Sequence, residues 1–333
     1  MTSGSDARRA LRVATSLALL AIVAWVVEPG EVLARLSRLD VRWVAAALAV
    51  SLAQVVVSAW RWRYTATRLG VALPFGTAVG EYYLATFLNQ VLPGGVVGDV
   101  SRAWRHHRAE DGSSPLSEEP SAQARTPAPS TSAVHVVILE RVSGQVVMLA
   151  AAAVAAAVLA TAPGTDAPAD AGARVAMIAA LAAVAGGLGG ALIGGMVALN
   201  RRRGGGRLDG FLGDARTALL GSALPVQAAV SLLIVASYVA VFVLAARAVG
   251  VDASTGLLAL TTPPILVAML IPVSVAGWGL REGAAAALWG IVGLSSADGV
   301  AVSVAYGLLV LVSSLPGAVV LLLSPPRSDP GGP

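Results

Sequence analysis

The stretch Leu224–Val249 reads LPVQAAVSLLIVASYVAVFVLAARAV and decides the fold class. A helix needs about 20 mostly apolar residues to cross a hydrocarbon core of about 30 Å, and this stretch is long enough. No water is present inside a bilayer, so the backbone of such a stretch can satisfy its own hydrogen bonds only as a helix. The stretch therefore predicts a transmembrane helix.

Other apolar stretches have the same character: Leu11–Val27, Trp43–Ala59, Val134–Ala160, Val175–Leu199 and Val300–Leu323. The chain is 56% hydrophobic and 13% charged, with a mean hydropathy of +0.76. Soluble domains are about 25% charged. We therefore expect an all-α, polytopic helical membrane protein with about six full spans. Its membrane domain covers residues 11–323, between a cytoplasmic N-terminus at 1–10 and a C-terminal tail at 324–333.

Two more apolar stretches, at residues 80–98 and 257–280, are too short or too interrupted to span comfortably. Each contains residues that end helices: Pro93, Gly94, Gly95 and Gly98 in the first, and Pro263, Pro264, Pro272, Gly277 and Gly279 in the second. We expect both stretches to re-enter the membrane without crossing it. Eight full spans are the alternative.

Arginine-rich segments predict the orientation. Residues 61–68, 102–108 and 201–216 fall on one side of this topology, and basic loops favour the cytoplasm. Both termini are then cytoplasmic, in a bacterial-type cell (inner) membrane, and the run Arg61–Tyr64 is typical of an interfacial anchor. Residues 109–132 are rich in Pro, Ser and acidic residues, which predicts a disordered loop.

Several kinds of chemistry have no support in the composition. The chain has no cysteine, all 23 basic residues are arginine, and its three histidines are His106, His107 and His135. Disulfides and lysine Schiff bases are excluded, and no spacing suggests a metal site or a cofactor. The chain has a net charge of +4. Its arginines lie mostly at the ends of the apolar segments, as they do in membrane anchors, so we expect no nucleic-acid partner.

The two broken stretches share a spacing. PGGVVGDVSR at 93–102 and PVSVAGWGLR at 272–281 match at an offset of 179: Pro93 with Pro272, Gly98 with Gly277, and Arg102 with Arg281. Such a pair is typical of an inverted repeat around a site near the middle of the membrane. Helix ends freed by Pro and Gly can face an anion, and the two arginines can bind a phosphate in a bidentate way.

Further polar residues lie near these motifs: Asn89, Asp99 and Glu282 beside the motifs, and Glu140 with Arg141 inside an apolar stretch. The candidate substrate-binding residues are Asn89, Pro93, Gly94, Gly95, Gly98, Asp99, Arg102, Glu140, Arg141, Pro272, Gly277, Gly279, Arg281 and Glu282. In the alternative interpretation, Pro and Gly merely end helices while Arg102, Arg281 and Glu140 reach the headgroup level. No residue is identified as a catalytic group.

Three segments, FLNQVLPGGVVGDVSRAW, ILERVSG and IPVSVAGWGLREG, resemble the lysylphosphatidylglycerol synthase transmembrane-region family. This family includes the flippase-like membrane domain of the multiple peptide resistance factor. The resemblance covers about residues 11–323, with one departure at Val97, where the family often has Gly. It implies a membrane domain that flips an aminoacylated phospholipid. Because the chain ends shortly after its last span, we expect no soluble synthase domain and no lysylphosphatidylglycerol synthesis by this chain alone.

The resulting expectation is a membrane translocase for a phospholipid or another lipid-linked anion, including a polyprenyl-linked lipid. One alternative is a membrane-embedded transferase with Asp99 or Glu282 as general base. Another is an accessory subunit that binds a separately encoded enzyme through residues 109–132 or 201–216.

Overall fold

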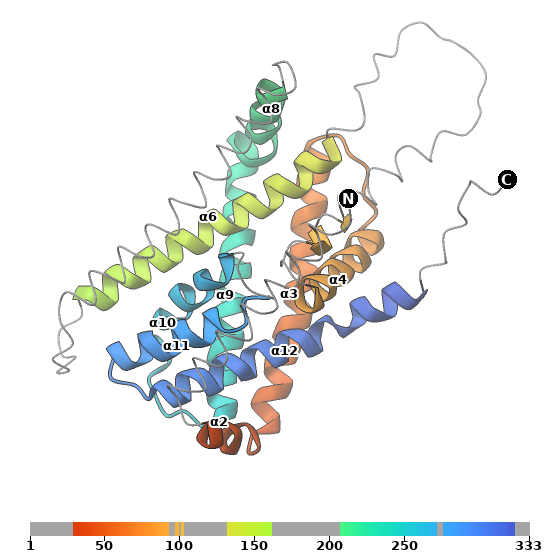
Figure 1. The fold of residues 1–333 in the computed structure, drawn as a ribbon. Coiled ribbons are helices and arrows are strands. Elements are labelled where there is room, and N and C mark those ends of the chain that lie inside the picture. The colour runs from red at the N-terminus through yellow and green to blue at the C-terminus, as the bar shows by residue number, and fades with distance from the viewer. Residues whose placement is uncertain are drawn as a thin grey trace, which may run out of the picture.

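The computed structural model describes residues 29–92, 97–99, 101–102, 132–161, 207–271 and 276–323. Every regular element within these ranges is a helix, so the expected all-α class is confirmed there. In chain order the elements (Figure 1) are α2 (Pro29–Leu36), α3 (Val41–Arg68), α4 (Phe75–Val91), α6 (Ser132–Thr161), α8 (Arg207–Leu219), η1 (Gly221–Ala223), α9 (Leu224–Val249), α10 (Thr255–Val267), η2 (Ala268–Leu270), α11 (Leu280–Ile291) and α12 (Ser296–Leu323).

Four helices are long and apolar enough to cross a membrane: α3, α6, α9 together with η1, and α12. They confirm four of the expected spans, and the two expected at Leu11–Val27 and Val175–Leu199 lie outside the described residues. A helix of 28 residues, such as α3, is about 42 Å long at 1.5 Å per residue, which exceeds the hydrocarbon thickness. The helices also expose large apolar side chains, including Leu232 at 58% and Leu322 at 82%.

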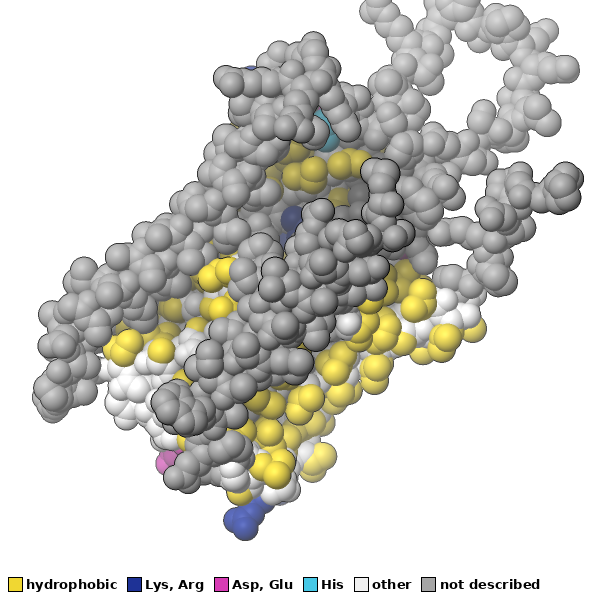
Figure 2. Space-filling model, in the orientation of Figure 1, with side chains coloured by type: hydrophobic (Ala, Val, Ile, Leu, Met, Phe, Trp, Pro, Cys, Tyr) yellow, Lys and Arg dark blue, Asp and Glu magenta, His cyan; other side chains and the backbone are white. Residues whose placement is uncertain are grey.

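Hydrophobic side chains cover the visible face around α12 (Figure 2). A soluble monomer rarely presents such an extensive apolar surface, whereas acyl chains solvate it well. Together with the long apolar helices, this surface identifies a multi-pass membrane protein. The loop expected at 109–132 lies outside the described residues, except that Ser132 already belongs to α6.

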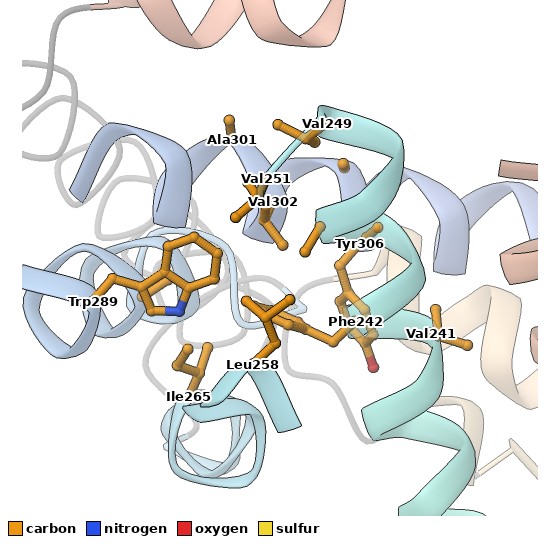
Figure 3. Close-up of a cluster of buried hydrophobic side chains, with 14 of the residues drawn as sticks. Val241, Phe242, Val249, Val251, Leu258, Ile265, Trp289, Ala301, Val302 and Tyr306 are labelled. Carbon is orange, nitrogen blue, oxygen red and sulfur yellow. The ribbon is translucent and has the colours of Figure 1, made fainter. Parts of the chain in front are cut away.

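The largest buried cluster joins α9, α10, α11 and α12 (Figure 3). The rings of Phe242 and Tyr306 pack with centroids 5.6 Å apart. Leu258, Ile265 and the fully buried Trp289 belong to the same cluster. This core holds α11 firmly against α12, and it thereby positions the charged residues at the start of α11.

Two ends of the bundle can be distinguished by their contacts. At the α2 end, Arg35 pairs with Asp298 at the start of α12 at 3.1 Å, and the amide of Asp40 donates to the Ala248 carbonyl near the end of α9 at 3.0 Å. At the α8 end, Arg68 at the end of α3 donates to the Thr217 carbonyl of α8 at 3.2 Å. The long helices run between these two ends (Figure 1).

The first broken stretch folds back beside α4. This helix starts at the α8 end and runs antiparallel to α12, with Gly80 near Val320. Residues 97–99 and 101–102 are helical and return along α4, because Gly98 lies against the backbone of Ala85 and Arg102 lies over the ring of Tyr82. The stretch therefore enters from the α8 end and returns toward it.

The second broken stretch has the opposite orientation. Its first helix, α10, starts at the α2 end, where Arg247 donates to the Thr255 hydroxyl at 3.0 Å. Its second helix, α11, ends there too, since the Ser296 hydroxyl donates to the Ala286 carbonyl at 2.8 Å. The two broken stretches thus form hairpins that enter the bundle from opposite ends.

The expected interruption at Pro263 and Pro264 is wrong, because both residues lie inside α10. Proline is tolerated in membrane helices where neighbouring groups supply hydrogen bonds. The carbonyls that lose an amide donor here are those of Ala259 and Leu260, four residues before the prolines. The hydroxyls of Thr261 and Thr262 donate instead to the Leu258 carbonyl, at 3.0 and 2.7 Å. The helix continues to Val267 and is followed by η2, and Pro272 lies outside the described residues.

Candidate functional site

Glu140 is the centre of a buried charge cluster. It lies on α6, is 0% exposed, and pairs with Arg61 of α3 at 2.5 Å and with Arg102 at 3.0 Å. The Tyr82 hydroxyl donates to the same carboxylate at 3.3 Å. The alternative interpretation, in which Glu140 reaches the headgroup level, is therefore wrong, because two guanidinium groups satisfy this carboxylate inside the bundle.

Asp99 extends this cluster. Its carboxylate pairs with Arg102 at 3.3 Å and with Arg141 of α6 at 2.5 Å, and it accepts a hydrogen bond from the Asn89 side-chain amide at 3.1 Å. The Asn89 oxygen accepts from the amide of Gly98 at 2.8 Å. Asn89 therefore connects the end of α4 to the returning segment and also fixes one oxygen of Asp99.

Gly98 is required by close backbone packing. A Cβ at this position would lie 2.0 Å from the carbonyl oxygen of Ala85, which no real side chain tolerates. Only glycine lets the returning segment approach α4 closely enough for Asp99 and Arg102 to reach their partners. Close packing at Gly98 thus brings the Asp99 carboxylate and the Arg102 guanidinium of this helical segment into the bundle.

The guanidinium of Arg102 lies between two aromatic rings, 4.4 Å from the Trp62 centroid and 4.6 Å from the Tyr82 centroid. Arg102 is only 1% exposed, so the interpretation that this side chain extends to the membrane interface is wrong. Stacking of a desolvated guanidinium on aromatic faces is favourable and orients its plane. Two of its nitrogens, Nε and Nη1, have no hydrogen-bond partner in the described part of the chain.

A second cluster lies at the start of α11. Glu282 is 0% exposed and caps its own helix, accepting from the Gly279 amide at 2.7 Å. It also accepts from Arg281 at 2.7 Å and from the Ser303 hydroxyl of α12 at 2.9 Å. Gly277 and Gly279 have φ angles of 80° and 86°, which glycine adopts without strain. The turn before α11 therefore depends on both glycines.

Arg281 has the same surroundings as Arg102. It is 2% exposed and lies between Trp278 at 5.1 Å and Tyr306 at 5.3 Å, with a carboxylate beside it. Gly307 leaves room for this guanidinium, because a Cβ there would lie 2.3 Å from Nη2 of Arg281. Arg281 is therefore also an internal residue, and the interpretation that it extends to the interface is wrong.

A cavity of about 790 Å³ lies between the two clusters. Asp99, Arg141 and Asn89 border it from the first hairpin and α6, and Gly277 and Arg281 border it from the second hairpin. Basic side-chain atoms are visible in a hollow of the surface (Figure 2). The remaining lining is largely apolar, with contributions such as Val55, Val134, Val137, Ile138, Met148, Ile234, Val235, Leu266, Leu270 and Val310.

The charges of the two clusters do not cancel. Within the described part of the chain, the two clusters hold four guanidinium groups and three carboxylates, which leaves one positive charge in excess: Arg61, Arg102, Arg141 and Arg281 against Asp99, Glu140 and Glu282. Arg141 is the most accessible of the four, with a side chain 40% exposed, and it borders the cavity. The site can therefore attract an anion while each buried carboxylate stays paired.

The sequence-derived candidates fall into three groups. Asn89, Asp99, Arg141, Gly277 and Arg281 border the cavity, and Gln90 does so as well. A second group supports these residues through ion pairs, hydrogen bonds or tight turns: Gly98, Arg102, Glu140, Gly279 and Glu282. The remaining candidates, Pro93, Gly94, Gly95 and Pro272, lie outside the described residues.

Arg61 and Trp62 are functional candidates that the sequence interpretation assigned wrongly. They were expected in an interfacial anchor, but they are 4% and 0% exposed. A usable signal existed, since Ser51, Ser58 and Thr65 recur every seven residues along the same helix and are all buried. A polar stripe at this spacing indicates a helix face directed at a polar interior.

Comparison with known proteins gives one result that covers most of the chain. A family model described as the lysylphosphatidylglycerol synthase TM region matches residues 9–317. No curated protein matches the chain significantly. The matched region includes both hairpins, both charge clusters, the whole of α3, α6 and α9, and α12 as far as residue 317. The chain therefore belongs to the lysylphosphatidylglycerol synthase transmembrane-region family.

Proposed function

We propose that this protein is a translocase that moves a phospholipid or another lipid-linked anion between the leaflets of a bacterial-type cell membrane. One observation carries the proposal: two hairpins of opposite orientation border one cavity inside the bundle, the first with Asp99 and the second with Arg281, and the guanidinium groups of Arg61 and Arg141 line it as well. Transport proteins with paired hairpins of this kind bind their substrate near the membrane midplane and expose it alternately to each side.

The lining of the cavity suits an amphiphile. Arg61, Arg141 and Arg281 offer guanidinium groups for a phosphate, whereas the apolar side chains around them can accommodate the first methylenes of acyl or prenyl chains. A small soluble anion would gain nothing from the apolar part. Family membership adds that the substrate is lipid-related, and its description names an aminoacylated phospholipid.

The remaining expectations belong to the same proposal. The hairpins re-enter the membrane rather than cross it, both termini are cytoplasmic, and a polyprenyl-linked lipid is the second substrate class. A separately encoded lipid-modifying enzyme is a possible partner in this scheme. None of these changes the site, which is built from α3, α4, α6, α11 and α12.

The transferase alternative has less support. A general base needs an ionised carboxylate that is free to accept a proton. Glu282 accepts from Arg281, Ser303 and the Gly279 amide, and Asp99 accepts from Arg102, Arg141 and Asn89. Both oxygens of each carboxylate thus already face donors, which favours a binding role.

The test is leaflet exchange in liposomes. The purified protein is reconstituted with fluorescent phosphatidylglycerol, lysylphosphatidylglycerol or polyprenyl phosphate, and exchange is followed by quenching of the outer leaflet. We expect exchange of at least one lipid with the wild type and its loss with Arg281→Ala. The matched control is Arg63→Ala, which removes an exposed arginine two positions from Arg61 and should retain exchange.

Folding is checked by size-exclusion chromatography and circular dichroism for every variant. No exchange of any of the three lipids by well-folded wild type would contradict the proposal. An equal loss of lipid exchange in Arg281→Ala and Arg63→Ala would show that removing any arginine lowers exchange, and that the cavity is not the cause.

A further inference from the structure

The cavity contains one carboxylate among its described lining residues, Asp99, and both of its oxygens are occupied. Oδ2 accepts from Asn89 and pairs with Arg141, and Oδ1 pairs with Arg102 at 3.3 Å. A ligand ammonium group would have to share this carboxylate with three donors that already engage both of its oxygens. Separating Arg141 from Asp99 would break an ion pair, and separating Arg102 from it would leave that buried guanidinium with Glu140 alone.

Donors, in contrast, are in excess at the cavity wall. Nε of Arg61 and Oγ of Ser51 belong to residues that are each 4% exposed, border the cavity, and have no hydrogen-bond partner in the described part of the chain for those atoms. Buried polar atoms without partners are rare in native proteins, and a bound ion or water is one explanation for them. Nε of Arg61 can only donate, so its missing partner is an acceptor, and the Ser51 hydroxyl can donate to the same group.

The excess positive charge of the two clusters also favours a ligand that is an anion. The four arginines of the two clusters outnumber their three carboxylates, and Arg141 presents a 40% exposed side chain to the cavity. A group with positive charge therefore meets repulsion and finds no unoccupied acceptor carboxylate in the described lining. A phosphate without an accompanying ammonium group is attracted by this positive charge, and Nε of Arg61 and the Ser51 hydroxyl are available to donate to it.

We propose that the cavity selects lipids whose headgroup carries a net negative charge, such as phosphatidylglycerol or a polyprenyl phosphate, and rejects aminoacylated lipids. This inference rests on the proposed function for its lipid, but it concerns binding preference and not movement. It separates this chain from the substrate that the family description names. In lysylphosphatidylglycerol the ammonium groups outnumber the phosphate, so the headgroup has the wrong sign for this site.

The test measures binding in detergent micelles with the full chain. Fluorescent phosphatidylglycerol is the probe, and unlabelled phosphatidylglycerol, lysylphosphatidylglycerol and soluble glycerol phosphate compete with it. We expect phosphatidylglycerol to compete at least about tenfold better than its lysyl derivative, a difference of about 1.4 kcal/mol. Glycerol phosphate should compete poorly, because it lacks the chains that contact the apolar lining.

Two variants of Arg141 test the charge argument. Arg141→Glu places a carboxylate at the accessible position, so the preference should fall about tenfold or reverse toward the lysyl lipid. Arg141→Gln removes the positive charge and should narrow the preference by a smaller factor, which keeps the inference testable if Arg141→Glu fails to fold. Arg63→Gln is the matched control and should leave the preference unchanged.

The outcomes separate the two proposals. Equal or tighter binding of the lysyl lipid by wild type, or a preference unaffected by either Arg141 variant, would overturn the charge selection. Glycerol phosphate competing as well as the lipid would assign the site to a soluble phosphate and overturn the lipid assignment. A clear preference for phosphatidylglycerol in micelles, with no leaflet exchange in liposomes, would support the selection while refuting translocation.

Discussion

Replacing Glu140 with glutamine removes the carboxylate that two buried arginines share. Arg61 would keep the Ser231 hydroxyl at 2.9 Å and the Glu140 backbone carbonyl at 3.3 Å, and Arg102 would keep Asp99 at 3.3 Å. Arg61 therefore loses its carboxylate partner and becomes a buried unpaired charge. Removal of one partner from a buried ion pair costs about 3–5 kcal/mol. The glutamine amide oxygen still accepts one hydrogen bond, so we expect a loss of about 3 kcal/mol.

Denaturant-induced unfolding in detergent micelles, followed by tryptophan fluorescence, measures this loss. Asp252→Asn is the control, because Asp252 is exposed and its neutralisation should change the free energy of unfolding by less than about 0.5 kcal/mol. The double variant Glu140→Gln with Arg61→Met removes the unpaired charge as well. It should recover more than about 1 kcal/mol relative to the sum of the single variants.

A loss for Glu140→Gln no larger than that for Asp252→Asn would refute the reasoning, because it would mean that Arg61 finds another counter-charge or reaches water. Strict additivity of the Glu140 and Arg61 substitutions would refute it too. In that case the two side chains would contribute independently and the 2.5 Å ion pair would carry no coupling.

Two further predictions concern the arginines of the hairpins. Gly307→Ala should displace Arg281, because the added Cβ lies 2.3 Å from its Nη2, and it should lower lipid exchange at least about tenfold, whereas Gly256→Ala, with no atom within 4 Å, should retain exchange. Unchanged exchange in well-folded Gly307→Ala would show that the position of Arg281 does not matter. Arg102→Lys keeps the charge but loses the planar stack between two rings, so it should lose about 1–2 kcal/mol of unfolding free energy. A lysine variant as stable as wild type would mean that charge alone holds this position.

The sequence was sufficient to predict the class of fold and the position of the spans within the described ranges. Apolar length alone identifies α6, α9 and α12, since a long helix in a membrane depends on few details. The end of α3 was misplaced, because Arg61 and Trp62 resemble interfacial residues when their partners are unknown. The partner of Arg61 is Glu140, 79 positions later, and no local pattern specifies such a contact.

The matched motifs predicted that Arg102 and Arg281 have related positions, and the structure places each between a Trp and a Tyr. The aromatic neighbours themselves were mostly beyond sequence reasoning. Tyr82 and Tyr306 come from helices that are adjacent only in the folded bundle. Gly307 was missed for the same reason, because a helical glycine in a membrane protein usually indicates helix packing and not space for a guanidinium group.

The ion pairs hold the two hairpins in different ways: those of the first join it to another helix, and that of the second lies within the hairpin itself. The segment with Asp99 and Arg102 is bound to α6 by two salt bridges, so pulling it away would separate opposite charges in a medium of low dielectric constant. The Arg281 and Glu282 pair, in contrast, lies within one helix and would travel with it, with the Ser303 hydroxyl as its hydrogen-bonding partner on α12. A rigid displacement of α10 and α11 thus keeps its opposite charges together. Among the described residues, moving the second hairpin would therefore separate no ion pair, whereas moving the first would separate two.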